Sequence, residues 1–92
     1  MLFVCICTDK PNSNALRMAT RPDHVKYLEA HKDKIVFGGP QLTDDGQTML
    51  GSVLVYDLPD RAAAEEQIKN DPYTKAGLFE STIIRATRKM FG

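Results

Sequence analysis

The chain has 92 residues, enough for one small domain spanning residues 1–92 but not for two. Its 12 Lys and Arg balance 12 Asp and Glu, so it lacks the basic surplus that general binding to nucleic acids or anionic membranes requires. The 42% of hydrophobic residues is typical of a globular protein, and the longest apolar run, Leu2–Cys7, is far too short to span a bilayer. No signal-peptide pattern surrounds that run, so we expect a soluble, cytoplasmic protein.

The first half of the chain predicts a strand, a helix and a second strand. The apolar segment Leu2–Thr8 is rich in strand formers and is followed by turn residues. Pro22 suits the first position of a helix, where its missing N–H costs nothing, so we expect a helix over 22–32. The mixed segment Ser13–Thr20 before it is compatible with a separate helical turn. Ile35–Phe37 predicts a short second strand, which we expect to end at the turn Gly38-Gly39-Pro40.

The second half predicts a strand, a helix and a last strand. Met49–Tyr56 is rich in apolar strand formers and predicts the third strand. Asp60 is the expected N-cap of a helix over Arg61–Lys69, which is rich in Ala, Glu and Gln. Pro72 ends this helix, because a proline disfavours helical geometry in the residue before it. Phe79–Thr87 predicts the fourth strand.

The element order β-α-β-β-α-β is that of the α+β ferredoxin-like fold, a four-stranded antiparallel sheet with both helices on one face. The first strand is apolar on both faces, yet the helices can cover only one. Monomers rarely expose an apolar patch as large as a whole sheet face. We therefore expect a homodimer that packs through its sheet faces, as a dimeric α+β barrel. The two faces of the first strand are Leu2, Val4 and Ile6 on one side and Phe3, Cys5 and Cys7 on the other.

His24 is the first candidate for chemistry. The expected helix places it in the first turn, where the helix dipole would favour the neutral imidazole that a general base needs. A carboxylate would orient its ring, and both Asp9 and Asp71 stand at the ends of elements, so either is a candidate partner. The alternative is structural, with His24 as an ordinary helix histidine and Asp71 as a turn or cap aspartate.

Other patterns predict little chemistry. The sequence contains no phosphate-binding glycine loop, no G-x-S-x-G elbow and no set of residues with zinc-site spacing, so we expect neither a metal nor an organic cofactor. Cys5 and Cys7 share one face of the first strand. We expect them to be buried core residues in a reducing compartment, and a redox pair is the open alternative.

Six short motifs give the sequence a resemblance to the YciI family, the proteins of the YCII-related domain. They follow one another at compatible spacing over nearly the whole chain. In order they are Asp9-Lys10, Arg21-Pro22-x-His24, Gly38-Gly39-Pro40, Gly51-Ser52, Asp71-Pro72-Tyr73 and Ala76-Gly77-Leu78.

The resemblance implies a ferredoxin-like fold that dimerises through its sheets, and an active site centred on a histidine and an aspartate. The motifs carry these roles to His24 and Asp71. Most members have no assigned reaction, and one removes HCl from chlorinated hydroxylated aromatic rings. We therefore expect a cofactor-independent lyase or isomerase acting on a small cyclic or phenolic substrate. The alternative is a non-catalytic dimer that binds a small molecule or a protein. Expected pocket residues are Arg21, Gly39, Pro40, Ser52 and Tyr73.

Overall fold

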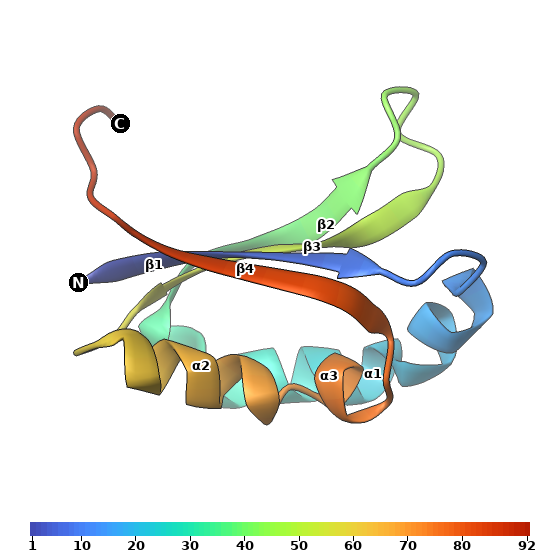
Figure 1. The fold of residues 1–92 in the computed structure, drawn as a ribbon, viewed down its shortest axis with the longest axis horizontal. Helices are drawn as coiled ribbons and strands as arrows, with labels where there is room; N and C mark the ends of the chain where they lie inside the picture. Colours follow the sequence, from blue (N-terminus) through green and yellow to red (C-terminus); the bar gives the residue numbers. More distant parts are fainter.

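A four-stranded antiparallel sheet carries all the helices on one of its faces in the computed structural model, which describes residues Met1 to Gly92 (Figure 1). The expected α+β ferredoxin-like order is confirmed, with a 3-10 turn, η1, and a one-turn helix, α3, added to it. The elements are β1 (Leu2–Asp9), α1 (Asn14–Ala30), η1 (Lys32–Lys34), β2 (Ile35–Leu42), β3 (Met49–Asp57), α2 (Arg61–Lys69), α3 (Pro72–Lys75) and β4 (Phe79–Thr87).

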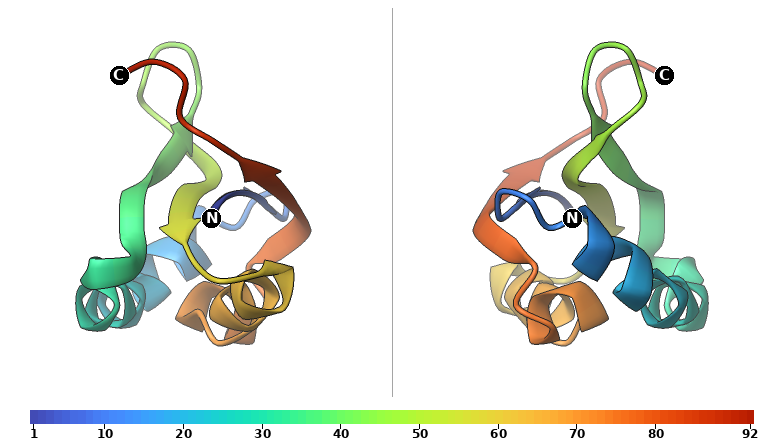
Figure 2. Two further views of the ribbon diagram at one scale, coloured as in Figure 1. Left: turned by 90° about the vertical axis from the view of Figure 1, so that its left-hand side faces the viewer. Right: turned by 90° about the vertical axis from the view of Figure 1, so that its right-hand side faces the viewer.

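The strand order β2-β3-β1-β4 puts the first strand in the middle of the sheet, paired with β3 on one side and β4 on the other. Phe3, Cys5 and Cys7 face the helices and are at most 3% exposed. They form the core with Leu54 and Tyr56 of β3. The opposite sheet face carries no helix, as both end-on views show (Figure 2).

Helix α1 begins at Asn14, so the predicted start at Pro22 is wrong and this proline lies inside the helix. An interior proline removes one backbone hydrogen bond and costs about 3 kcal/mol. The additional N-terminal turns are held from outside the helix, because the Arg17 side chain forms an ion pair with Asp9 at the end of β1. This tertiary contact outweighs the local preference that placed the helix start at the proline.

Strand β2 continues through Gly38-Gly39-Pro40 to Leu42, so the predicted turn at these residues is also wrong. β2 is an edge strand that pairs only with β3, and an edge strand tolerates the missing N–H of Pro40. A Cβ at Gly38 would lie 3.2 Å from Leu54 Cδ2. The glycine therefore lets the edge strand run close over the core.

The second half of the chain follows the sequence prediction closely. β3 and β4 lie where they were expected, and Asp60 caps α2 by accepting a hydrogen bond from the Ala63 N–H at 2.9 Å. Asp71 caps the added helix α3. None of the helices is both long and apolar enough to cross a membrane.

Candidate active site

His24 lies in the middle of α1, not in its first turn, so the argument from the helix dipole does not apply. Because the helix begins at Asn14, it also contains two arginines before the histidine. One face of the helix carries Arg17, Arg21 and His24, at spacings of four and three residues. All three side chains line one cleft under the sheet. His24 is 8% exposed.

Asp71 reaches His24 from the junction between α2 and α3. Its Oδ1 lies 2.8 Å from His24 Nδ1 and accepts the Tyr73 backbone N–H at 2.9 Å. The Asp71 side chain is completely buried. A carboxylate can only accept hydrogen bonds, so Nδ1 carries the hydrogen and Nε2 is left to take a proton from a ligand. Asp71 is thus both a helix cap and the hydrogen-bond partner of His24.

Asp9, the other candidate partner, binds Arg17 instead. Arg17 Nε lies 2.7 Å from Asp9 Oδ2, and Arg17 Nη2 lies 3.1 Å from Asp9 Oδ1. Nη2 also donates to Ser52 Oγ at 2.8 Å. Arg17 is only 3% exposed, and the sequence analysis missed it. The sequence signal for Arg17 is that it stands seven residues before His24. This spacing places both side chains on the same face only if one helix contains both residues.

The Tyr73 ring lies between the two basic side chains. It stacks on the His24 ring with a centroid distance of 3.9 Å and an interplanar angle of 18°. The Arg17 Cζ lies 4.5 Å from the Tyr73 ring centroid. Burial raises the pKa of Tyr73, although the nearby Arg17 and Arg21 oppose this. Tyr73 therefore presents a neutral aromatic ring, which favours the guanidinium of Arg17 and the protonated form of His24 beside it.

The cleft beside these residues has a volume of about 250 Å³. Arg17 and His24 line it, and Asp71 lies out of contact with it. Its opposite wall is the glycine-rich part of β2. The structure brings all five expected pocket residues to this cleft: Arg21, Gly39, Pro40, Ser52 and Tyr73. No group of three or more His, Cys, Asp or Glu residues is arranged to hold a metal ion.

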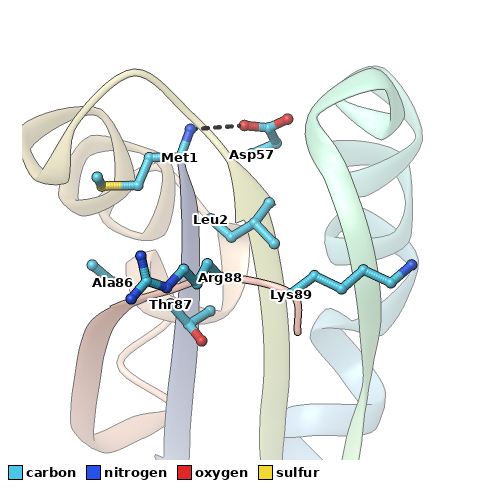
Figure 3. A pocket seen from close by; sticks show the side chains of 7 residues that line it. All are labelled: Met1, Leu2, Asp57, Ala86, Thr87, Arg88 and Lys89. Atoms are coloured by element: carbon cyan, nitrogen blue, oxygen red, sulfur yellow. Dashed lines mark hydrogen bonds and ion pairs between the residues drawn. The ribbon is translucent and has the colours of Figure 1, made fainter. Parts of the chain in front are cut away.

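A larger cavity of about 530 Å³ lies where β1 begins and β4 ends (Figure 3). The Met1 ammonium donates to Asp57 Oδ1 at 3.1 Å on its rim, and Arg88 and Lys89 extend in opposite directions across it. Its lining contains no histidine and no cysteine. We therefore place the candidate chemistry in the smaller cleft, which is lined by two arginines and by a histidine that a buried carboxylate supports from behind.

Cys5 and Cys7 are both completely buried and unpaired. Burial raises the pKa of Cys5 to about 11 and that of Cys7 to about 12. Both are therefore protonated thiols at neutral pH, and a thiolate is the form that redox chemistry requires. This environment favours the core interpretation over the redox pair.

The YCII-related domain matches residues 1–88 of the chain. Protein YciI of Escherichia coli O6:H1 is 28% identical over 98 residues, which cover 99% of this chain and 100% of the relative. An uncharacterised protein of Haemophilus influenzae matches with the same identity and coverage.

Among solved structures, 5-chloro-2-hydroxyhydroquinone dehydrochlorinase (TftG) of Burkholderia phenoliruptrix AC1100, in complex with 2,5-dihydroxybenzoquinone, superposes with a TM-score of 0.88 at 37% identity. The match covers 96% of this chain and 94% of that one. Rv0793 of Mycobacterium tuberculosis, at 14% identity and a TM-score of 0.58, shares the fold alone.

Proposed function

The chain belongs to the YCII-related domain family, and from this premise we propose that it is a cofactor-independent lyase or isomerase acting on a small cyclic or phenolic ring. One observation carries the proposal. His24 Nδ1 is bonded to the buried Asp71 at 2.8 Å, which directs the other ring nitrogen to the ligand. The likeness to a dehydrochlorinase at 37% identity supports the same reaction class.

In the proposed mechanism His24 Nε2 removes the proton of a ring hydroxyl. The imidazolium that forms is stabilised by Asp71, while the Tyr73 ring stacked against it offers a favourable face to a cation. The negative charge left on the substrate spreads from the oxygen into the ring. When His24 returns its proton to a ring carbon, the product is the keto tautomer, and the net reaction is an isomerisation.

Elimination follows when that ring carbon carries chlorine. Chloride leaves with the electron pair of the C–Cl bond, and a second hydroxyl gives its proton to His24, which is neutral again at this stage, so that conjugation is restored in a quinone. The sum is the loss of HCl, with no change in the oxidation state of the protein. His24 serves as base and as acid in turn, so no further group on the chain is needed.

Chloride release from 5-chloro-2-hydroxyhydroquinone tests the proposal. The wild-type protein should release chloride and His24→Ala should not. The control is His31→Ala, because His31 lies at the end of α1 and bonds the Tyr27 carbonyl at 2.8 Å, away from the cleft. If His24→Ala keeps full activity, the mechanism is wrong. Saturable binding without turnover in the wild-type protein would instead support the non-catalytic binding module.

We further propose that the chain is a homodimer joined through its open sheet faces. The open face carries apolar side chains that are only half-buried. Val4 of β1 is paired with Val55 of β3, and Ile6 follows Val4 on the same face of β1. Ile83 of β4 and Phe37 of β2 extend the apolar surface and are 48% and 56% exposed. A second copy of the same face would remove this surface from water and close a barrel.

A further inference from the structure

The cavity of about 530 Å³ at the start of β1 has a basic lining. The Met1 ammonium, Arg88 and Lys89 each bring a positive charge to it. Asp57 is the only carboxylate of the lining, and it is bonded to the Met1 ammonium at 3.1 Å. Arg88 and Lys89 are exposed and form no ion pair within the chain. Two cations therefore remain free to meet an acidic partner at this cavity.

The hairpin between β2 and β3, residues 43–48, is acidic. It carries Asp44 and Asp45, both exposed, and no basic residue. Asp45 accepts hydrogen bonds from the Thr43 hydroxyl at 2.6 Å and from the Gln47 N–H at 3.0 Å, which hold the tip of the hairpin in one shape. Asp44 forms no ion pair within the chain. The hairpin is therefore an ordered acidic projection with an unpaired carboxylate.

The acidic hairpin and the basic cavity lie at opposite ends of β3. This strand begins at Met49, beside the hairpin, and ends at Asp57, in the lining of the cavity. In Figure 1 the hairpin rises at the right and the C-terminal tail at the left, both on the side away from the helices. The molecule is 34 Å long, so a hairpin cannot reach the cavity of its own chain.

Two kinds of two-fold axis could bring the open sheet faces of two copies together. An axis parallel to the strands would place hairpin against hairpin and tail against tail, so that like charges meet. An axis across the strands, between the two sheets, would place each hairpin against the cavity of the other copy. Opposite charges would then meet twice, once at each end of the dimer. Electrostatics therefore favours the axis across the strands.

We propose that the basic cavity is the docking site for the acidic hairpin of a second copy, and that two such contacts clasp the dimer. The inference rests on the proposed sheet-face dimer and goes beyond it, because it assigns the cavity and fixes the direction of the two-fold axis. The cavity is continuous with the proposed interface, since Leu2 in its lining lies on the same face of β1 as Val4 and Ile6.

The apolar residues beside the charges fit the same arrangement. Met90 and Phe91 follow the two basic residues of the tail and are 76% and 94% exposed. Leu42 and Leu50 stand on either side of the hairpin and are also exposed. In the clasp the tail of one copy packs against these leucines of the other, which removes apolar surface of both from water.

Crosslinking with a short bismaleimide tests the clasp. The double variant Asp44→Cys with Lys89→Cys should give covalent dimers, whereas each single variant should not, because each new thiol then faces a residue without one. The native Cys5 and Cys7 are completely buried, so they do not react. The control is Glu65→Cys with Lys89→Cys, which moves one thiol to the exposed side of α2 and should give no covalent dimer.

Charge reversal provides a second measurement. Arg88→Glu with Lys89→Glu should raise the dimer dissociation constant in sedimentation by about tenfold or more at low salt, because carboxylates then face carboxylates. Adding Asp44→Lys should recover about threefold or more of that loss. The control is Lys32→Glu with Lys34→Glu, which makes the same change of charge on the exposed turn η1 and should leave the constant unchanged.

Three results would overturn the inference: covalent dimers from either single variant, none from the double variant, or a dissociation constant that charge reversal leaves unchanged. A wild-type dimer whose single variants link like to like would keep the sheet-face dimer and refute the clasp. A wild-type monomer in light scattering would refute both. Chloride release tests the enzyme separately, because no residue of the hairpin or the basic cavity lines the cleft.

Discussion

Replacing Asp71 by Asn removes one charge from the site and little else. The Tyr73 N–H must still find an acceptor at the position of Oδ1, so the new amide is held with its oxygen there. That oxygen can accept the His24 Nδ1 hydrogen as before, at the 2.8 Å that the carboxylate occupies. We therefore expect Asp71→Asn to fold and to keep the same imidazole tautomer. What it loses is the charge that stabilises the imidazolium during proton transfer.

The size of the loss follows from two estimates. A hydrogen bond to a charged group is worth about 1.5–3 kcal/mol net and a neutral one about 0.5–1.5, a difference of about 1–2 kcal/mol. Unit charges about 4 Å apart at an effective dielectric of about 20 attract by about 4 kcal/mol, which sets the upper limit. We expect kcat/KM for chloride release to fall about 5- to 1,000-fold.

The assay compares Asp71→Asn with Asp60→Asn. Asp60 caps α2 as Asp71 caps α3 but contacts no histidine, so its variant should keep wild-type kcat/KM. The double variant Asp71→Asn with His24→Ala should be no slower than His24→Ala alone, because Asp71 acts through the imidazole. Activity of Asp71→Asn within twofold of wild type, or a further loss in the double variant, would refute this reasoning.

Three more predictions concern assembly and stability. Val4→Glu should convert the proposed dimer to monomers in light scattering, whereas Ala62→Glu on the exposed face of α2 should not; a wild-type monomer would refute the interface. Gly51→Ala should lower the urea midpoint sharply, because its Cβ would lie 2.1 Å from the Cys7 carbonyl oxygen; an unchanged midpoint contradicts this. Burial raises the pKa of Cys5 to about 11 and that of Cys7 to about 12, from 9.0. The contribution of the two buried thiols to the free energy of unfolding is therefore fully present below pH 9.0, and it is lost as the pH rises towards the raised pKa values. Unfolding at pH 10 should therefore require about 1.4 kcal/mol less per thiol than at pH 8, and replacing both by Ala should remove the share of the pH dependence that the two thiols contribute.

Local patterns predicted most of the sheet and missed the start of one helix. The positions of β3 and β4 were predicted correctly because turn residues stand on both sides of each run of apolar strand formers. The start of α1 was misplaced because Pro22 is a strong local signal, while the contact that extends the helix is the pairing of Arg17 with Asp9 across the fold. A sequence pattern carries no information about such a distant partner.

The same error hid part of the candidate site. A helix that begins at Pro22 leaves Arg17 outside it, so the alignment of Arg17 with His24 on one helix face could not be predicted. The proximity of His24 to Asp71 was expected from the resemblance to the family, since spacing alone left Asp9 equally open. Gly39 and Pro40 line the cleft from within an edge strand rather than from the predicted turn.

A single oxygen atom, Asp71 Oδ1, receives both the first backbone N–H of α3 and the ring N–H of His24. Fraying of this short helix would release the carboxylate and displace Tyr73 from the imidazole in the same event. Local melting and loss of the oriented base are therefore one transition, which can precede global unfolding on heating. The Tyr73 amide is its natural reporter, because its hydrogen-exchange rate measures how often the assembled dyad opens.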